Sequence, residues 1–274
     1  MERRLAVMAG AGVLPGRAAA EAARQGWQVV AFTFDAAAGI EAHAERVVPC
    51  SLTDLQEVVR ALRDAKVRSV IFVGKLWKKE VFSRVGATDD LGRHIARSGL
   101  SDEALAAMVL ATLEGMNIEV LDPRPFLDPW MAGAGTLTAR APTPAEWSEI
   151  QAGFALARHL AAYGIGQSVV RSRGVTLAVE AAEGTDETIQ RGTSLGGPGA
   201  VVVKAVAEGH DFRFDIPTIG PATLEAMATG GATALAVEGG KVLIVDREAT
   251  VRFADKAGIT IVSSSDLSSS GGHA

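Results

Sequence analysis

The stretch LAVMAGAGVLPGRAAAEAARQGWQVVAFTF, residues 5–34, decides the fold class. Its first five residues are apolar, which predicts a buried strand over residues 5–9. Glycine and proline then break the apolar run, and the alanine-rich residues 14–25 carry charges at helical spacing, which predicts a helix. A second apolar run over residues 27–34 predicts another strand. Continuous apolar strands separated by helices are typical of a parallel sheet covered on both faces, so the stretch indicates an α/β fold.

The same alternation continues through the first half of the chain. We expect its further elements to be helices over 53–65, 89–98 and 101–116 and strands over 67–73 and 118–121. Thr53 and Ser101 are good N-caps, because each is followed by an acidic residue that suits the positive end of a helix. Residues 1–130 are therefore predicted to form a Rossmann-like domain, with a parallel sheet and helices on both faces.

A proline-rich stretch separates the two halves of the chain. Because proline fixes φ and lacks an N–H donor, regular structure is not expected there, and we place a linker at 131–145. A second α/β domain with a mixed sheet is expected over 146–264, followed by a disordered, serine-rich tail at 265–274. The expected elements of the second half are helices over 144–163, 185–191, 221–229 and 247–257 and strands over 168–173, 175–180, 200–206, 233–237, 242–245 and 259–262.

The composition limits the class of protein. With 274 residues, 48% hydrophobic and 22% charged, the chain has the make-up of a globular protein rather than a disordered one. A net charge of −5 argues against a nucleic-acid-binding protein. The single cysteine, Cys50, excludes an internal disulfide and fits a reducing compartment. No apolar run reaches the length of about 18 residues that a membrane span needs, so we expect a cytoplasmic protein.

Glycines follow the first predicted strand. Gly10 and Gly12 let a backbone approach a ligand closely, and Pro15 suits the first turn of a helix whose N-terminus attracts phosphate. Asp35 lies near the position where dinucleotide-binding folds keep the acid that binds ribose. Because Pro15 replaces the third glycine of that fingerprint, a nucleotide site and a structural turn both stay open.

A second glycine follows the strand predicted over 67–73. Gly74 and Lys75 come at its carboxyl end, where open α/β sheets bind ligands. A lysine beside a glycine suits a phosphate, so we keep Lys75 as a candidate. Lys78 and Lys79 are better explained as the solvated face of a helix.

Acidic residues gather in the second half of the chain. Glu180 ends an apolar strand, which is an unusual place for a carboxylate, and Glu183 and Asp186 follow it. The alternative explanation is a helix start, in which Thr185 or Gly184 caps the helix and Asp186 and Glu187 complement its dipole.

Asp215 lies between Phe214 and Ile216. A carboxylate buried among apolar neighbours must be neutralised, paired or bound to a metal, so we expect Asp215 to be buried and functional. Oxygen ligands without a histidine or cysteine cluster favour Mg²⁺ or another hard divalent cation.

Several signatures of other enzyme classes are missing from the sequence. It contains no GxxxxGK[ST] phosphate-binding loop, no GxSxG nucleophile elbow and no HExxH zinc motif. The five histidines are isolated from one another, and Cys50 has no histidine partner in sequence.

Longer strings in the sequence resemble one enzyme family. AGAGVLP, VGKL, LDPRPFL, IGQSVV, LAVEAAEGTDETIQRG and FDIPTIGPATLEAMATGGATALAVE are similar to segments of the LpxI family of UDP-2,3-diacylglucosamine pyrophosphatases, which act in the lipid A pathway of Gram-negative bacteria. The likeness extends over about residues 3–262. It implies Mg²⁺-dependent hydrolysis of UDP-2,3-diacylglucosamine to UMP and 2,3-diacylglucosamine 1-phosphate (lipid X), on a two-domain scaffold that holds lipid between its domains.

The resemblance, together with the residues above, assigns candidate roles. Asp215 maps onto the essential aspartate of the family, and Lys204 is the second catalytic candidate. The expected metal ligands are Asp215, Glu180, Glu183 and Asp186. The expected substrate-binding residues are Gly10, Gly12, Leu14, Pro15, Gly74, Lys75, Thr185 and Thr218.

Partners and rival functions follow from the same residues. We expect the partners to be the lipid substrate UDP-2,3-diacylglucosamine and its product lipid X, and we expect no nucleic acid. Peripheral contact with the inner membrane and a homodimer are two further expectations. An NAD(P)-dependent oxidoreductase would explain Gly10, Gly12 and Asp35 but not the acidic strings of the second half. A non-catalytic lipid or nucleotide carrier would explain a cleft but not a need for Asp215.

Overall fold

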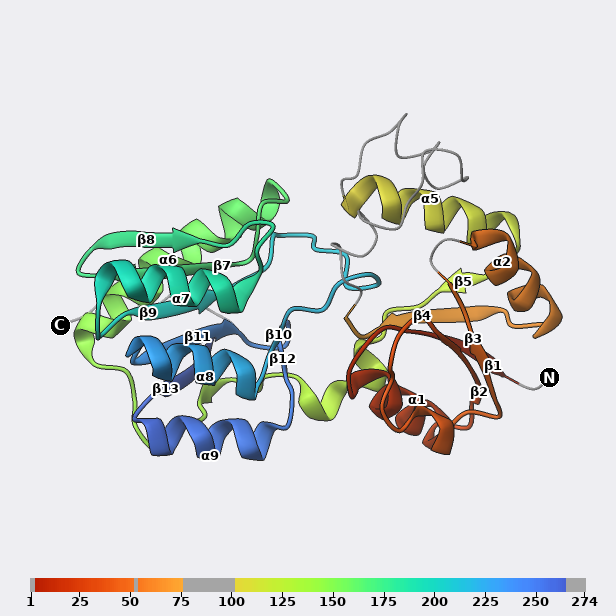
Figure 1. Ribbon diagram of the computed structural model, residues 1–274, viewed down its shortest axis with the longest axis horizontal. Helices are drawn as coiled ribbons and strands as arrows, with labels where there is room; N and C mark the ends of the chain where they lie inside the picture. Colours follow the sequence, from red (N-terminus) through yellow and green to blue (C-terminus); the bar gives the residue numbers. More distant parts are fainter. Residues whose placement is uncertain (1–2, 52–53, 76–101, 265–274) are drawn as a thin grey trace. The chain divides into compact units, whose positions relative to one another are not determined.

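The computed structural model describes residues 3–51, 54–75 and 102–264 (Figure 1). The chain divides into two compact units. Unit 1 holds residues 1–128 together with 211–215, and unit 2 holds residues 129–210 and 216–274. The predicted helix over 89–98, the predicted N-caps Thr53 and Ser101, the lysines Lys78 and Lys79, and the tail 265–274 lie outside the described residues.

Unit 1 is built on a parallel sheet, as the first half of the sequence predicts. Among the described residues its strands run in the order β3-β2-β1-β4-β5, and all pairings are parallel. The strands are β1 (Arg4–Ala9), β2 (Gln28–Thr33), β3 (Arg46–Pro49), β4 (Ser69–Val73) and β5 (Glu119–Val120). The helices are α1 (Leu14–Arg24), α2 (Leu55–Asp64) and α5 (Asp102–Gly115). The central strand β1 is apolar throughout after Arg4 and is buried on both faces.

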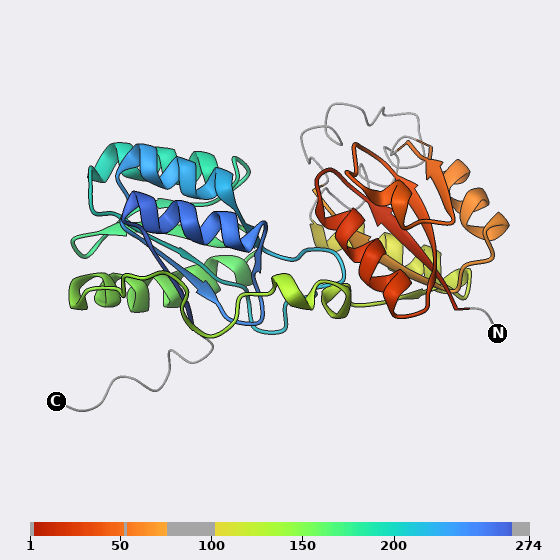
Figure 2. The same ribbon diagram turned by 90° about the horizontal axis from the view of Figure 1, so that it is seen from below.

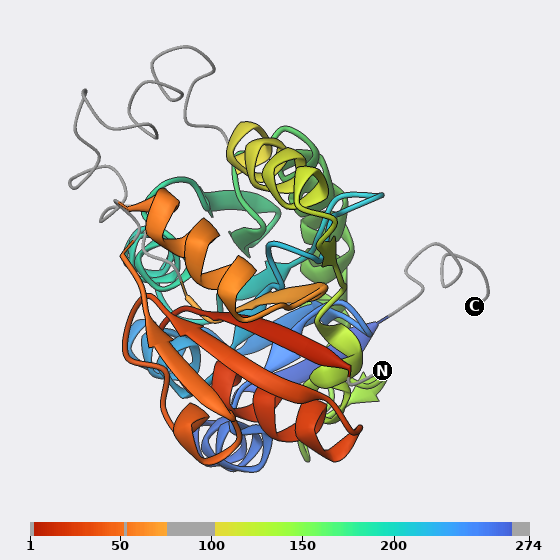
Figure 3. The same ribbon diagram turned by 90° about the vertical axis from the view of Figure 1, so that its right-hand side faces the viewer.

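Helices cover both faces of this sheet (Figure 3). The α2 and α5 helices pack on the face that carries Met8, Phe32 and Val70, and α1 packs on the opposite face, against β1, β2 and β4. The helix α2 begins at Asp54, whose carboxylate accepts a hydrogen bond from the Glu57 N–H at 2.9 Å.

Unit 2 is built on a mixed sheet. Among the described residues its strands run in the order β6-β13-β11-β9-β7-β8. The strands β9, β11 and β13 are parallel to one another, while β7 and β6 pair antiparallel at either side. The strands are β6 (Gly135–Thr136), β7 (Ser168–Ser172), β8 (Val175–Val179), β9 (Val201–Lys204), β11 (Ala234–Glu238) and β13 (Thr260–Ser264), and a separate pair is β10 (Thr218–Ile219) with β12 (Leu243–Ile244).

The helices of unit 2 also lie on both faces of its sheet (Figure 2). They are α6 (Pro144–Ala162), α7 (Thr185–Gly196), α8 (Pro221–Gly230) and α9 (Arg247–Ala257). The α6 helix buries Ile150 and Phe154 against Val203 on one face. The other three helices bury residues such as Ile189 and Leu224 on the opposite face.

The predicted fold class is confirmed, with differences in the short elements. The strands β3, β6 and β10 were not expected, because runs of two to four residues carry too little periodicity to be recognised in a sequence. The strand β6 lies inside the stretch 131–145 that the sequence indicated as a linker, and it pairs with β13 of unit 2. Two short 3₁₀ helices, Arg124–Phe126 and Asp128–Trp130, also lie in the proline-rich region.

The segment 211–215 is the largest departure from the predicted domain division. Its position in the sequence predicts that it belongs to the second domain, whereas by its contacts it belongs to unit 1. The ring of Phe214 packs on Phe72 of β4, with centroids 5.1 Å apart. Such a contact joins residues more than 140 positions apart, so no local pattern announces it.

Candidate functional site

Each unit carries a group of the predicted site residues, and the two groups are described separately. In unit 1 the group lies at the carboxyl ends of the neighbouring strands β1 and β4. The strand order reverses between β1 and β4, because the chain continues from β1 toward β2 on one side and from β4 toward β5 on the other. Open α/β sheets bind ligands at the carboxyl ends of the strands at such a point. Gly10, Gly12, Leu14 and Pro15 follow β1, and Gly74 and Lys75 follow β4.

The two loops of unit 1 are tied together by backbone hydrogen bonds. The N–H of Ala11 donates to the Lys75 carbonyl at 2.9 Å, and the N–H of Lys75 donates to the Ala11 carbonyl at 3.0 Å. The N–H of Gly12 donates to the carbonyl of Ala36 at 3.1 Å. The glycine-rich loop is therefore held from both sides, and it forms a rigid rim above the sheet.

Close packing explains two of the glycines in this rim. A Cβ atom at Gly10 would lie 2.7 Å from the Lys75 carbonyl oxygen. At Gly74, where φ is +100°, a Cβ atom would lie 2.8 Å from the ring of Pro15. The structural explanation that the sequence left open thus accounts for Gly10, Gly74 and the buried Pro15. Gly12 is exposed and has no atom within 4 Å of its Cβ position, but its φ of +103° lies in the left-handed region that favours glycine.

The start of α1 remains suited to an anion. Its N-cap is Val13, which supplies no side-chain hydrogen bond, and its first turn holds no acidic residue. Backbone N–H groups at a helix start carry partial positive charge, which attracts phosphate. Gly12 and Lys75 are exposed beside this helix start, and Asp35 is exposed too, with its carboxylate accepting from the Ala36 N–H.

The second group forms a buried polar cluster in unit 2. Lys204, the last residue of β9, donates through Nζ to Thr185 Oγ1 at 2.8 Å and to Ser168 Oγ at 3.3 Å. Thr185 in turn donates to Glu180 Oε1 at 2.9 Å, and Glu180 Oε2 lies 3.7 Å from the Lys204 ammonium. The sequence predicts three of these four residues as site residues, and the structure brings them into direct contact.

The sheet and the start of α7 position this cluster. Glu180 directly follows β8, and Thr185 is the first residue of α7. Ser168 begins β7 directly opposite Lys204 in the antiparallel pair, which explains their contact. Ser168 could not be recognised as a site residue from the sequence, because only the register between β7 and β9 places it there. The Lys204 side chain is 5% exposed and that of Glu180 is 13% exposed, so the cluster is shielded from water.

The cluster keeps Glu180 ionised. Burial alone would raise the pKa of this carboxyl, but the Lys204 charge and hydrogen bonds from Ser168, Thr185 and the Gln167 N–H outweigh it and hold the pKa below its ordinary value. A lysine and a glutamate buried together are stable only as such a paired unit.

The other predicted metal ligands do not join this cluster in the described structure. Glu183 accepts a hydrogen bond from Arg191 and one from Thr188, and these bonds together with one to its own backbone N–H lower its pKa. Asp186 lies in the first turn of α7. Among the described residues, no three carboxylate, histidine or cysteine side chains converge as a metal site. The oxygens of Glu180 and Glu183 already accept hydrogen bonds and each carboxylate is paired with a cation, so they do not fit a direct metal-ligand set.

Asp215 is exposed, so the prediction that it is buried among apolar neighbours is wrong. The reason is that the neighbouring ring of Phe214 turns into the core of unit 1, where it joins Phe72, while the carboxylate does not follow it. Asp215 therefore belongs to unit 1, close in sequence to an anchored aromatic ring. Thr218 lies in β10 of unit 2, and its hydroxyl donates to the Ile216 carbonyl at 2.8 Å.

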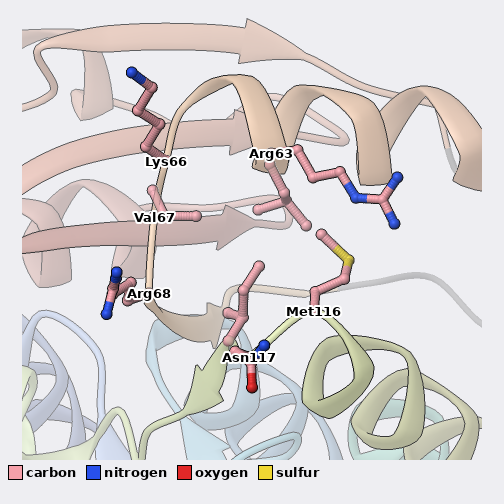
Figure 4. A pocket seen from close by; sticks show the side chains of 8 residues that line it. Arg63, Lys66, Val67, Arg68, Met116 and Asn117 are labelled. Carbon is pink, nitrogen blue, oxygen red and sulfur yellow. The ribbon is translucent and has the colours of Figure 1, made fainter.

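A surface pocket of about 620 Å³ lies elsewhere on unit 1 (Figure 4). Residues 66–68 and 116–118 of its lining precede β4 and β5, so it lies at the amino ends of the strands, opposite the glycine loops. Arg63, Lys66 and Arg68 surround it, but their charged ends point away from one another (Figure 4). This arrangement does not focus positive charge on one ligand.

Comparison with known proteins follows the division of the chain. Residues 4–130 match the family model described as LpxI N-terminal domain, and residues 133–262 match the one described as LpxI C-terminal domain. The chain belongs to the LpxI family. A relative from Caulobacter vibrioides, named UDP-2,3-diacylglucosamine pyrophosphatase LpxI, is 30% identical over 279 aligned positions, which cover 95% of this chain and 97% of the relative. Membership of the LpxI family confirms the resemblance seen in the sequence.

A distant likeness was also found among solved structures. The structure of glycinamide-RNase-transformylase T from Mycobacterium tuberculosis covers 65% of this chain and 44% of its own, at 16% identity and a TM-score of 0.25. At this level the likeness gives no information on fold or function. Within the described part of the chain, no helix has both the length and the apolar character needed to cross a bilayer.

Proposed function

We propose that this LpxI-family chain hydrolyses the diphosphate bond of UDP-2,3-diacylglucosamine, releasing UMP and 2,3-diacylglucosamine 1-phosphate. The observation that carries the proposal is the match of both domains to the family, with a relative of that name aligned along 95% of the chain. The buried Lys204–Glu180–Thr185 cluster supports it, because a charged cluster at the carboxyl edge of a sheet is typical of a functional site rather than of a core.

In the proposed reaction, water attacks one phosphorus atom. A new P–O bond forms, the bond between that phosphorus and the bridging oxygen breaks, and the water loses a proton. Asp215 is exposed and suits the role of orienting this water and accepting its proton. In unit 2, Lys204 donates to Thr185 at the start of α7, and we propose that its positive charge favours binding of the substrate phosphates. In unit 1, the uncapped start of α1 and the exposed Lys75 suit contacts to substrate phosphate.

Dependence on Mg²⁺ is a further part of the proposal. Diphosphate oxygens are ligands that Mg²⁺ prefers, and the ion commonly keeps several waters and binds through substrate phosphates with only one or two carboxylates. Because Glu180 and Glu183 are engaged by cations, no catalytic step is assigned to a metal held by them.

The experiment that tests the activity is direct. Purified protein is incubated with UDP-2,3-diacylglucosamine in detergent with Mg²⁺, and UMP and the lipid phosphate are measured. We expect equal amounts of the two products. Formation of UDP would show cleavage of the sugar–phosphate bond, and NADPH binding without product would favour the oxidoreductase alternative; either result contradicts the proposal.

A cytoplasmic location with peripheral contact at the membrane is proposed from the diacyl nature of the substrate. The cations at the amino ends of the unit 1 strands lie at the edge opposite the glycine loops, so we propose that the acyl chains rather than a basic surface lead this contact. Flotation with anionic vesicles tests it: the variant with Arg63→Gln, Lys66→Gln and Arg68→Gln should float as the wild type does, and loss of binding would contradict the proposal.

We also propose a homodimer, which light scattering of the purified protein tests.

A further inference from the structure

A short segment from the second half of the sequence is anchored in unit 1. Residues 211–215 follow more than 80 residues of unit 2 and are followed by unit 2 again, yet their contacts lie within unit 1. The proposed catalytic residue Asp215 is the last residue of this segment. Whatever holds the segment therefore decides where the Asp215 carboxylate lies.

The first anchor of the segment is Arg124, in the turn after β5. Its guanidinium carbon lies 3.7 Å from the centroid of the Phe212 ring, which is the distance of a close cation–π contact. Arg124 belongs to unit 1 and comes from the string LDPRPFL, to which neither the fold nor the proposed reaction has assigned a role.

Asp122 fixes the orientation of that guanidinium. Its carboxylate accepts from the backbone N–H of Arg124 at 2.9 Å, from Nε at 2.9 Å and from Nη2 at 2.6 Å. A two-pronged pair of this kind holds the planar guanidinium in one orientation, so that its flat face is presented to the Phe212 ring. The side chains of Arg124 and Asp122 are 33% and 34% exposed, so the pair is not part of the hydrophobic core.

The second anchor is the ring of Phe214. It packs on Phe72 of β4 at a centroid distance of 5.1 Å and belongs to the same hydrophobic cluster as the α2 and α5 contacts. Within the segment, Arg213 is paired with Asp211 through Nη2 at 2.7 Å. The segment thus has one aromatic anchor at residue 212 and one at residue 214, directly before Asp215.

We propose that Asp122 and Arg124 are positioning residues for Asp215. Asp122 orients Arg124, Arg124 holds Phe212, and the segment in turn keeps the Asp215 carboxylate in a fixed place on unit 1. This inference rests on the proposed role of Asp215 in hydrolysis. It differs from a direct role of Arg124 on the substrate phosphates, in which Arg124 would act without Asp215.

The structural part of the inference can be tested without activity. In Arg124→Ala, hydrogen exchange of the peptide that covers residues 211–215 should become at least about 10-fold faster, because the segment loses the contact between Arg124 and Phe212. Arg24→Ala is the matched control, since Arg24 is also on unit 1 and forms a two-pronged pair, with Glu21, but contacts no part of the segment. Unchanged exchange in Arg124→Ala would overturn the inference even if the enzyme hydrolyses its substrate.

Kinetics test the consequence for catalysis. Arg124→Ala should lower kcat by about 10- to 100-fold with little change in KM, as expected when a catalytic group is misplaced. Phe212→Leu should give a similar loss, and the double variant should be no worse than either single variant, because both remove the same contact. Thermal unfolding should show that the variants remain folded.

A double variant with Asp215 separates positioning from direct phosphate binding. In the Asp215→Asn background, Arg124→Ala should cause no further loss of the residual rate. A loss that adds to that of Asp215→Asn, or a change confined to KM, would overturn the positioning role. If Asp215→Asn itself keeps full activity while exchange of the segment responds to Arg124→Ala, the proposed role of Asp215 fails and the anchoring stands.

Discussion

Lys204 ends a strand whose other three residues are valines, and its buried ammonium is matched by the carboxylate of Glu180. Removing one partner would leave the other charge buried without compensation. We therefore expect Lys204→Met to lower the free energy of unfolding by about 3–5 kcal/mol. Urea unfolding measures this, and the double variant with Glu180→Gln should recover part of the loss. A Lys204→Met protein as stable as the wild type would contradict this account of the pair.

The same pair predicts a dependence of stability on pH. The pKa of Glu180 is held below its ordinary value of 4.5, so its contribution to stability is complete above that value and is lost as the pH falls toward the folded pKa. Thermal unfolding midpoints measured from about pH 7 to about pH 3 should therefore fall more steeply for the wild type than for Glu180→Gln. Parallel curves for the two proteins would contradict the prediction.

Whereas changes at Lys204 are expected to act mainly on stability, a change at Asp215 is expected to act mainly on activity. Because Asp215 is an exposed residue, we expect Asp215→Asn to lower the free energy of unfolding by less than the loss of the buried Lys204 does. The proposed role in activating water predicts that the same change lowers kcat by about 100-fold or more. UMP release and a thermal unfolding scan on one preparation measure both effects. Near-normal hydrolysis would remove Asp215 from the mechanism.

At the scale of elements, the start of α6 shows how local sequence determines a helix boundary. Thr143 accepts a hydrogen bond from the Glu146 N–H at 3.2 Å, and Glu146 accepts from the Thr143 N–H at 2.7 Å, which is a capping box. Arg140 also pairs with Glu146 at 2.8 Å. Burial would raise the pKa of Glu146, but Arg140 and Thr143 lower it to about 2.

Loss of this cap predicts a measurable change in stability. Thr143→Ala should lower the free energy of unfolding by about 1 kcal/mol, because one helix N–H loses its acceptor. Urea unfolding measures the difference. Thr112→Ala is the control: Thr112 is exposed on α5, its hydroxyl donates only to the Met108 carbonyl in its own helix, and its removal should have little effect. Equal losses in the two variants would exclude a specific contribution of the cap.

For the molecule as a whole, the match of the chain to both LpxI domains leads to a prediction about a divalent cation. We expect EDTA to abolish hydrolysis and added Mg²⁺ to restore it, since a diphosphate substrate carries the oxygen ligands that this ion prefers. The unfolding midpoint should change little on chelation, because Glu180, the acid of the buried cluster, is already paired with Lys204. Full activity in EDTA would show that hydrolysis needs no free divalent cation.

Much of this architecture could be predicted from local patterns. The apolar runs around residues 5–9 and 27–34 and the helix between them lie within two residues of β1, β2 and α1, and α9 has the predicted bounds. Glu180 and Lys204 can be picked out as candidates because a charged residue at the end of an apolar strand is visible in the sequence, and Thr185 because it begins a predicted helix. Their mutual contact cannot be predicted in this way, since it depends on β7 and α7 arriving at the same edge of the sheet.

The α/β class, the division into two parts and the family can all be read from contiguous residues, because apolar periodicity and family strings are local features of the chain. The tertiary structure alone decided that Ser168 lies opposite Lys204 and that residues 211–215 pack in unit 1. It also decided that Asp215 is exposed although its neighbours in sequence are apolar. The physical reason is that these features depend on contacts between distant residues, for which strand register and side-chain packing leave no local trace in the chain.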